Sequence, residues 1–333
     1  MSDNNRHSEK RRFLSAEQAR KLEQTLLKKP DDFEARTQLL IYYMLEAFHS
    51  EEAHKSHLRH ILWVIQHHPD ADLAGTPFVQ LHREQDEEAI REVKLLWIQQ
   101  AANHPDNASV LGNAAKFFIH AVSEDWPKAR DWLHIAELLD PDNPEWPEQS
   151  GLLFEFERRQ LQGLQRKVAA QHALQHYERA YSLTADEEGR LLLLDNLARN
   201  ALVAEEFTKA GEYAAKLLEG AALCKDGGHT WNYGNVLHWG HITLGKLAFR
   251  QDDKQTAILH LQEAGNTPGS PQLNSFGPDM SLARELLEQG EKEAVLAYLK
   301  ACSKFWQSGG DRLAAWVSAI RQNRTPDFGS RHD

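Results

Sequence analysis

Cysteine and positive charge are both scarce in this sequence. Its 333 residues include two cysteines, Cys224 and Cys302, which do not form a CxxC pair. Two thiols are too few for a disulfide framework, so we expect them to be reduced, as is usual in the cytoplasm. The 38 Lys and Arg are outnumbered by 49 Asp and Glu, which gives a formal net charge of −11. Such a chain has no general attraction for phosphate backbones, which argues against nucleic acid as a partner.

Long apolar runs and the signatures of common enzymes are also missing. No stretch is apolar for long enough to span a membrane, and the polar start of the chain does not read as a secretory signal. Phosphate-binding GxxxxGK[ST], GxGxxG, HExxH, GxSxG and EF-hand motifs are absent. We therefore expect a cytoplasmic protein without membrane contact, cofactor or enzymatic activity, although catalytic groups can also converge from distant segments.

What the chain does contain is a repeated helical pattern. Three apolar segments of helical period, 58–72, 93–108 and 129–144, run into Pro69, Pro105 and Pro141, which are 36 residues apart both times. Proline ends a helix, and the Asp or Asn that follows suits the turn before the next one. Another apolar helix is expected upstream of each segment, at 33–48, around 74–84 and at 108–122. Two helices per repeat predict stacked helical hairpins.

The best-preserved unit is 238–269, with Leu244 and Gly245 in its first helix and Ala257, Leu261 and Ala264 in its second. This spacing of small and large residues resembles the tetratricopeptide repeat (TPR), over roughly residues 30–305. The resemblance implies an all-α fold, a right-handed superhelical solenoid of stacked helical hairpins. The block GSPQLNSFGP also resembles a C-terminal block of uncharacterised bacterial TPR-like proteins, which implies a bacterial cytoplasmic origin.

Four regions follow from this pattern. We expect a polar, disordered N-terminus at 1–29 that leads into the first helix, and N-terminal repeats at 30–142. C-terminal repeats are expected at 143–323, interrupted by an ordered loop at 267–279, and a disordered tail at 324–333.

The first helix of each hairpin in such a solenoid lines the concave face. The repeat register then places six residues on an exposed stripe, with Asp195 a further candidate: Asn196, Arg199, Trp239, Thr243, Lys246 and Arg250. An aromatic anchor beside Arg and Lys suits an extended peptide that carries a carboxylate. The leading hypothesis is therefore a scaffold that binds a protein or peptide segment, and the alternative is a merely solvated helix face.

The stretch TPGSPQLNSFGPDM at 267–280 contains three prolines and two glycines, so we expect it to be no helix. Leu273 and Phe276 would prefer burial, which favours an ordered loop that plugs the C-terminal core. The loop could instead lie across the concave face near Trp239. Its candidate binding residues are Ser270, Gln272, Asn274, Ser275 and Phe276.

Histidines supply the alternative function. His238 and His241 are three residues apart, a spacing that can place two imidazoles on one metal ion. A third ligand would have to come from Cys224, His229, His260, Asp279 or Glu285. The second hypothesis is thus an enzyme or metal-binding protein with a site built from His238, His241 and the loop at 267–279. Buried histidines with hydrogen-bonded rings are the plainer interpretation, and a self-associating scaffold is a third possibility.

Most tryptophans, Trp97 and Trp231 among them, fall on apolar stripes and are expected in the core. The Gly- and Asn-rich stretch 227–235 is expected to be a loop or a ragged helix start.

Overall fold

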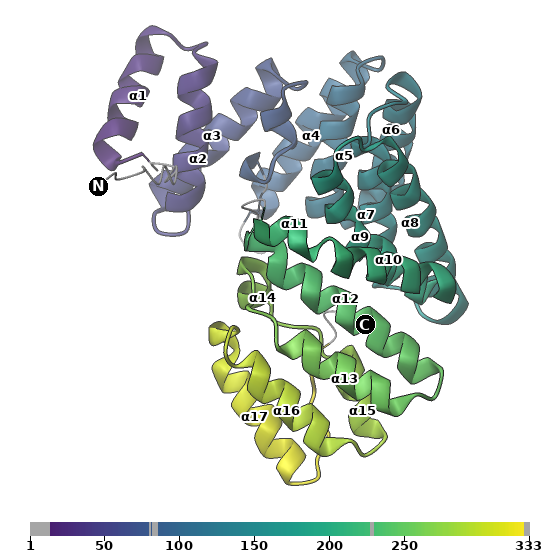
Figure 1. Ribbon diagram of the computed structural model, residues 1–333. Coiled ribbons are helices and arrows are strands. Elements are labelled where there is room, and N and C mark those ends of the chain that lie inside the picture. The colour runs from purple at the N-terminus through teal and green to yellow at the C-terminus, as the bar shows by residue number, and fades with distance from the viewer. Residues whose placement is uncertain (1–13, 80, 82–85, 227–229, 330–333) are drawn as a thin grey trace, which may run out of the picture. The chain divides into compact units, whose positions relative to one another are not determined.

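The computed structural model describes residues 14–79, 81, 86–226 and 230–329. Within these ranges the regular elements are all helices, which confirms the all-α class (Figure 1). None of the described helices is both long and apolar enough to cross a bilayer. The chain divides into two compact units, unit 1 at 1–146 and unit 2 at 147–333. The sequence placed this division slightly earlier, between 142 and 143.

Unit 1 is a series of helices joined by short turns, except for a longer connection at 68–86. Its elements are α1 (Ala16–Lys28), α2 (Phe33–Glu46), α3 (Glu51–His67), η1 (Asp72–Gly75), η2 (Pro77–Val79), α4 (Glu87–Asn103), α5 (Ala108–Ala121), η3 (Ser123–Asp125) and α6 (Trp126–Leu139). Helix α7 (Glu145–Arg158) crosses the division between the units.

Three helices of unit 1 end in the same way. Helices α3, α4 and α6 end at His67, Asn103 and Leu139, and the next residue in each has φ between −139° and −129° and ψ between 55° and 73°. That residue precedes a proline, whose ring excludes the helical conformation from the position before it. The helix ends therefore follow the predicted spacing of 36 residues.

The helix expected around 74–84 is not formed. Residues 72–79 instead make the two short 3₁₀ turns η1 and η2, and most of 80–85 lies outside the described residues. Gly75 and Pro77 interrupt any longer helix here. Gly75 also allows a close approach to α5, since a Cβ at this position would lie 2.1 Å from Oδ1 of Asn113.

Both ends of the described chain are more ordered than we expected. Helix α1 falls within the region 1–29 predicted to be disordered, and it begins with a capping box between Ser15 and Gln18. In the predicted tail, Phe328 is buried and the Trp316 indole donates to the carbonyl of Asp327. An aromatic residue that fills a core position thus orders this segment, while 1–13 and 330–333 lie outside the description.

Unit 2 contains further hairpins and one irregular segment. Its elements are α8 (Gly163–Leu183), α9 (Glu187–Val203), α10 (Phe207–Glu219), α11 (Ala221–Asp226), α12 (Thr230–Arg250), α13 (Lys254–Gly265), α14 (Pro271–Phe276), α15 (Ser281–Glu288), α16 (Lys292–Cys302), η4 (Gln307–Gly309) and α17 (Gly310–Arg321). Helix α9 packs on α10 and α12 on α13, and α12 also contacts both α9 and α10.

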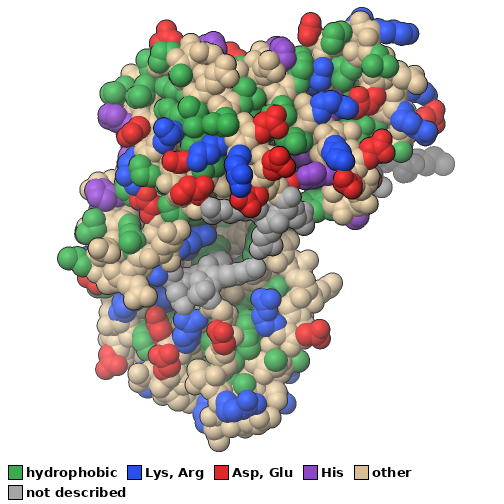
Figure 2. Space-filling model, turned by 180° about the vertical axis from the view of Figure 1, so that it is seen from behind, with side chains coloured by type: hydrophobic (Ala, Val, Ile, Leu, Met, Phe, Trp, Pro, Cys, Tyr) green, Lys and Arg blue, Asp and Glu red, His purple; other side chains and the backbone are tan. Residues whose placement is uncertain are grey.

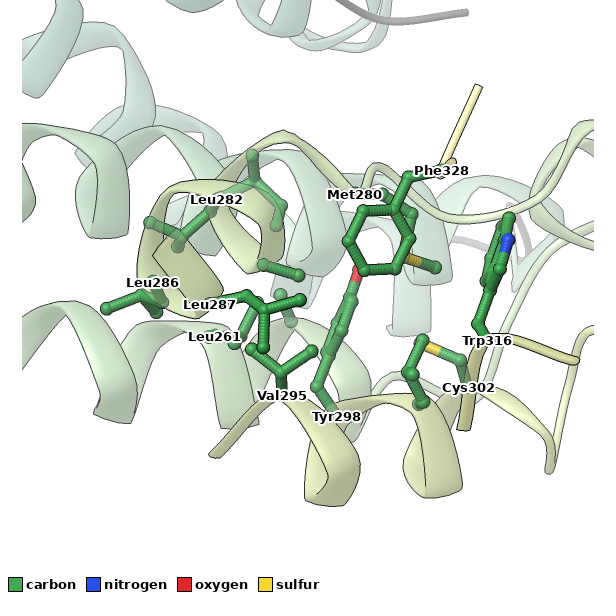
Figure 3. Packing of buried hydrophobic residues seen from close by; sticks show 14 of the residues in the cluster. Leu261, Met280, Leu282, Leu286, Leu287, Val295, Tyr298, Cys302, Trp316 and Phe328 are labelled. Atoms are coloured by element: carbon green, nitrogen blue, oxygen red, sulfur yellow. The ribbon is translucent and has the colours of Figure 1, made fainter. Parts of the chain in front are cut away.

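The core of the C-terminal hairpins is formed by α12, α13, α15, α16 and α17 (Figure 3). Ala257, Leu261 and Ala264 are fully buried there, in agreement with the small–large–small pattern. Gly245 lets α12 approach its neighbours, because a Cβ would lie 2.4 Å from Cδ2 of Leu282. Gly245 is thus a position of close helix packing.

The surface carries charges of both signs. On the face shown in Figure 2, the described Lys and Arg side chains are interspersed with Asp and Glu. Recognition by such a surface depends on the local arrangement of a few residues.

Candidate functional site

The stretch 267–280 contains a short helix, which corrects the prediction that no helix forms here. Helix α14 begins at Pro271, a position where proline needs no N–H partner and already has the helical φ. The Ser270 hydroxyl caps it by accepting from Leu273 N at 2.9 Å. Gly277, at φ 86°, ends it in a conformation that favours glycine. The prolines and glycines thus delimit a helix.

This stretch is hydrogen-bonded along α12. The Thr267 hydroxyl donates to the carbonyl of Gly234 at 2.9 Å, and the Ser270 hydroxyl donates to Oδ1 of Asn235 at 2.6 Å. The backbones touch here, since a Cβ at Gly234 would lie 1.9 Å from the carbonyl oxygen of Gly269. The segment is therefore an ordered part of the wall next to α12.

The prediction that Leu273 and Phe276 are buried in the C-terminal core is correct for Leu273 only. Leu273 is buried, with 2% of its surface exposed, whereas Phe276 is 61% exposed. Asn274 holds the far end of α14, because its side chain accepts from Gln307 N and its carbonyl accepts from the Ser308 hydroxyl. Ser275 is exposed. One helical turn can direct only part of its side chains into the core, so Leu273 alone fills it.

His238 has a structural role. Its Nε2 accepts from Asp279 N at 2.9 Å, so its Nδ1 carries the proton and donates to the carbonyl of Ala264 at 3.0 Å. Both ring nitrogens are thus used, and neither has a lone pair left for a metal ion. This argues against the proposed metal site, and no group of three His, Cys, Asp or Glu converges among the described residues.

His241 has a different partner. Its Nδ1 lies 3.0 Å from Nδ1 of His260, and burial lowers the pKa of both imidazoles. His229 was a further ligand candidate and lies outside the described residues.

A pocket of about 240 Å³ lies between α9 and α12, with contributions from α10 and α14. We call it the α9–α12 pocket. It brings together the predicted residues Trp239 and Gln272 with Asp195. The lining residues are Leu191, Leu192, Asp195, Leu217, Trp231, Asn232, Asn235, Val236, Trp239 and Gln272.

Side-chain amides form one wall of this pocket. The Asn235 amide nitrogen donates to Oδ1 of Asn232 at 3.0 Å and to Oε1 of Gln272 at 3.1 Å. Because Asn232 and Gln272 use their oxygens in these bonds, their NH₂ groups can serve as donors to a ligand. The network fixes the three amides before anything binds.

Arg199 lies behind the opposite wall. Its Nη1 donates to Oε1 of the buried Glu155 at 2.9 Å, its Nη2 bonds Asn196 at 2.5 Å, and its guanidinium lies 4.8 Å from the Trp239 ring centroid. Arg199 and Trp239 thus meet as predicted. The charge of Arg199 is already neutralised, however, so it is not free to grip a peptide carboxylate.

Glu155 is the centre of this ion cluster. Burial disfavours its charged form, yet Arg199, Arg158 and Arg159 outweigh burial and lower its pKa to about 2. The Tyr177 hydroxyl also donates to it, at 3.2 Å. Asp195 shares Arg199 at the longer distance of 3.4 Å, and burial raises its pKa above the ordinary value.

The rest of the predicted stripe lies away from the pocket. Thr243 is buried, which contradicts its predicted exposure, because α12 packs against helices on several sides. Lys246 donates to the Ser281 hydroxyl at 2.9 Å and lies 3.3 Å from Glu285. Arg250 is exposed at the end of α12.

Seven of the ten lining residues were not predicted as site residues, Trp231, Leu192 and Asn235 among them. Trp231 was expected in the core but is 42% exposed. Leu192 is also 42% exposed. Asn235 was expected in a loop or a ragged helix start, and it lies in the first turns of α12, which begins at Thr230. The Gly- and Asn-rich stretch before the best-preserved repeat was the sequence feature from which this amide wall could have been predicted.

Compared with protein-family models and with curated proteins, the chain shows no match. The pocket's own chemistry is therefore the basis for a function.

Proposed function

We propose that this protein is a TPR-like scaffold whose α9–α12 pocket binds an extended segment of a partner protein. The observation that carries the proposal is the pocket itself, with two tryptophans, a carboxylate and three ordered amides around about 240 Å³. Its helices α9 and α12 are the first members of consecutive hairpins, which in a solenoid would face the same side.

The pocket favours a basic side chain of the partner. Among its described lining residues, Asp195 alone is ionisable, and it lies 3.4 Å from Arg199, which is not a lining residue. Because Arg199 already contacts the Trp239 ring, Trp231, which is 42% exposed, is the indole available to a cation. An indole face attracts a cation, and a nearby carboxylate adds to that attraction. This replaces the carboxylate ligand expected from the sequence, because Arg199 and Lys246 are paired with acids of the same chain and Arg250 is not a lining residue.

The amide wall suits the backbone on either side of such a side chain. The NH₂ groups of Asn232 and Gln272 can donate to peptide carbonyls, and their positions are already fixed by Asn235. Fixing the donors in advance reduces the entropy that binding would cost. The pocket has room for one long side chain, so affinity would depend on the flanking contacts.

A peptide selection tests the proposal. Random peptides displayed on phage are selected on the full chain, and the enriched peptide is then measured by fluorescence anisotropy. Leu192→Glu, at the exposed pocket edge, should weaken binding about tenfold or more. Leu259→Glu, on α13 and 60% exposed, is the matched control and should bind as the wild type does. Failure to enrich any peptide, or equal binding by Leu192→Glu, would overturn the proposal.

A further inference from the structure

A second recessed surface lies in unit 1. A groove of about 610 Å³ runs between α1 and α3, with Arg36 of α2 at its base. We call it the α1–α3 groove. It shares no residue with the α9–α12 pocket, and its properties are independent of the function proposed above.

The floor of the groove is apolar. Leu58, Leu62 and Trp63 contribute from α3, and Leu26 and Leu27 from α1. Leu27 is 85% exposed, the most exposed large apolar side chain among the described residues. The opposite face of α3 packs inside unit 1, where Ile61, Val64 and Ile65 are fully buried. Helix α3 therefore has two apolar faces, and unit 1 covers the second, with Leu58, Leu62 and Trp63, only in part.

Cations surround this floor. The side chains of Lys55 and Arg59 are 73% and 57% exposed, and Arg36 lies 4.0 Å from the centroid of the Trp63 ring. Three cations thus line the groove against one lining anion, Glu23, and Lys55 is also paired at 2.7 Å with Glu51 beyond the lining. Glu23 is itself bonded to Arg59 at 2.6 Å and to His60 Nε2 at 3.2 Å. The groove is a local basic surface on an acidic chain.

The spacing along α3 matches a helix-binding face. Lys55, Leu58, Arg59, Leu62, Trp63 and Gln66 lie at steps of three and four residues, so they form one continuous stripe. Leucines and cations alternate along that stripe. A partner helix that lies in the groove would place apolar side chains against Leu58 and Leu62 and acidic ones against Lys55 and Arg59.

We propose that the α1–α3 groove binds an acidic amphipathic helix of a partner protein, with leucine-like side chains on one face and Asp or Glu along its edges. The apolar stripe supplies the contact area, and Lys55 and Arg59 select the charge. A basic helix or a second copy of this chain would be a different occupant, and both are outcomes of the test below.

The test uses two synthetic probes. One is a capped peptide of Leu, Ala and Glu, about 18 residues long so that it can form a helix, and the other has Lys in place of every Glu. Both carry fluorescein, and anisotropy is measured with the full chain at low and at high salt. We expect the acidic peptide to bind at least tenfold more tightly than the basic one, with an affinity that falls as salt rises.

Two variants locate the binding. Leu27→Asp with Lys55→Glu should weaken binding of the acidic peptide about tenfold or more, and both side chains are exposed enough to leave folding intact. Leu138→Asp, on α6 of the same unit and 68% exposed, should bind as the wild type does. Circular dichroism checks that each variant is folded. Three results would overturn the proposal: binding of neither peptide, equal binding of both, or unchanged binding by the double variant. Sedimentation would also overturn it if the wild type self-associates and the Leu27 variant does not.

Discussion

The α1–α3 groove and the α9–α12 pocket differ in chemistry although both lie between helices of hairpins. The α1–α3 groove in unit 1 is open, leucine-rich and bordered by cations. The α9–α12 pocket in unit 2 is smaller and combines two tryptophans with amides and one carboxylate. The difference teaches that the segments between hairpins can determine the kind of site. Unit 1 uses short proline turns, whereas unit 2 inserts α14, which contributes Gln272 to the pocket.

Both units bury polar groups with partners, but the ion cluster of unit 2 is larger. In unit 1 the buried Asp86 lies 2.7 Å from His54, and the buried His57 donates to the carbonyl of Phe78. In unit 2 the buried Glu155 lies among three arginines, and one of them, Arg199, contacts Trp239 of the α9–α12 pocket. We therefore expect the largest effects from substitutions in this cluster and the smallest from the proline turns of unit 1.

Removing the Glu155 carboxylate should have the largest effect. Glu155→Ala leaves the buried Arg158 and Arg199 without their shared counter-charge, and breaking a buried ion pair typically costs about 3–5 kcal/mol. Urea unfolding measures the loss, and hydrogen exchange should place it in 147–333 rather than in 14–146. Arg159→Ala removes a half-exposed partner and is the control, with a change of about 1 kcal/mol or less. A loss below about 1 kcal/mol for Glu155→Ala would show that the cluster contributes little.

The pH dependence of stability should show the contribution of the same carboxylate, Glu155. The pKa of Glu155 is lowered from 4.5 to about 2, so its stabilisation is present above pH 4.5 and is lost as the pH falls toward 2. Glu155→Gln cannot lose this proton-linked contribution. Its free energy of unfolding should therefore decrease less than that of the wild type between about pH 5 and pH 3. Parallel curves for the two proteins would contradict the pKa shift.

Helix α14 contains one buried and one exposed apolar residue whose effects on stability can be compared. Leu273→Ala should destabilise the protein by about 2–4 kcal/mol, because it empties a buried position of the core. Phe276→Ala removes a larger but exposed side chain and should change stability by about 0.5 kcal/mol or less. Thermal and urea unfolding of the two variants measure the difference. Equal effects would mean that α14 is not seated as described.

Substitutions of the turn prolines of unit 1 should change the free energy of unfolding least, and by similar amounts at all three positions. Pro69→Ala, Pro105→Ala and Pro141→Ala each replace a proline that follows a helix end of nearly the same geometry. Each should reduce stability by about 0.4–1 kcal/mol, since the unfolded chain gains freedom. Urea unfolding of the three variants checks this. A much larger effect at one proline would show that the three turns are not equivalent.

The comparison also shows what could be predicted from sequence. The helix ends at His67, Asn103 and Leu139 were predictable, because proline acts on its immediate neighbours. Helix α14 was missed although its signals were local, since Ser270, Pro271 and Gly277 mark the start and end of a helix as readily as a loop.

The site was predictable only in part. A repeat register brought Arg199 and Trp239 to one face, and they do meet. It could not show that Arg199 is paired with Glu155, which lies 44 residues away in the chain and on another helix. The exposure of Trp231 and the burial of Thr243 likewise depend on how α12 packs against its neighbours. The periodicity of apolar residues in the sequence does not determine this packing.

Photo-crosslinking tests the central claim most directly. The peptide enriched on the full chain is synthesised with a benzophenone beside its basic residue, irradiated with the protein, and the crosslinked residues are identified by mass spectrometry. Binding in the α9–α12 pocket predicts crosslinks to Leu192, Trp231 or Gln272, and their loss when excess unlabelled peptide is added. Crosslinks confined to α13, α16 and α17 would contradict the account.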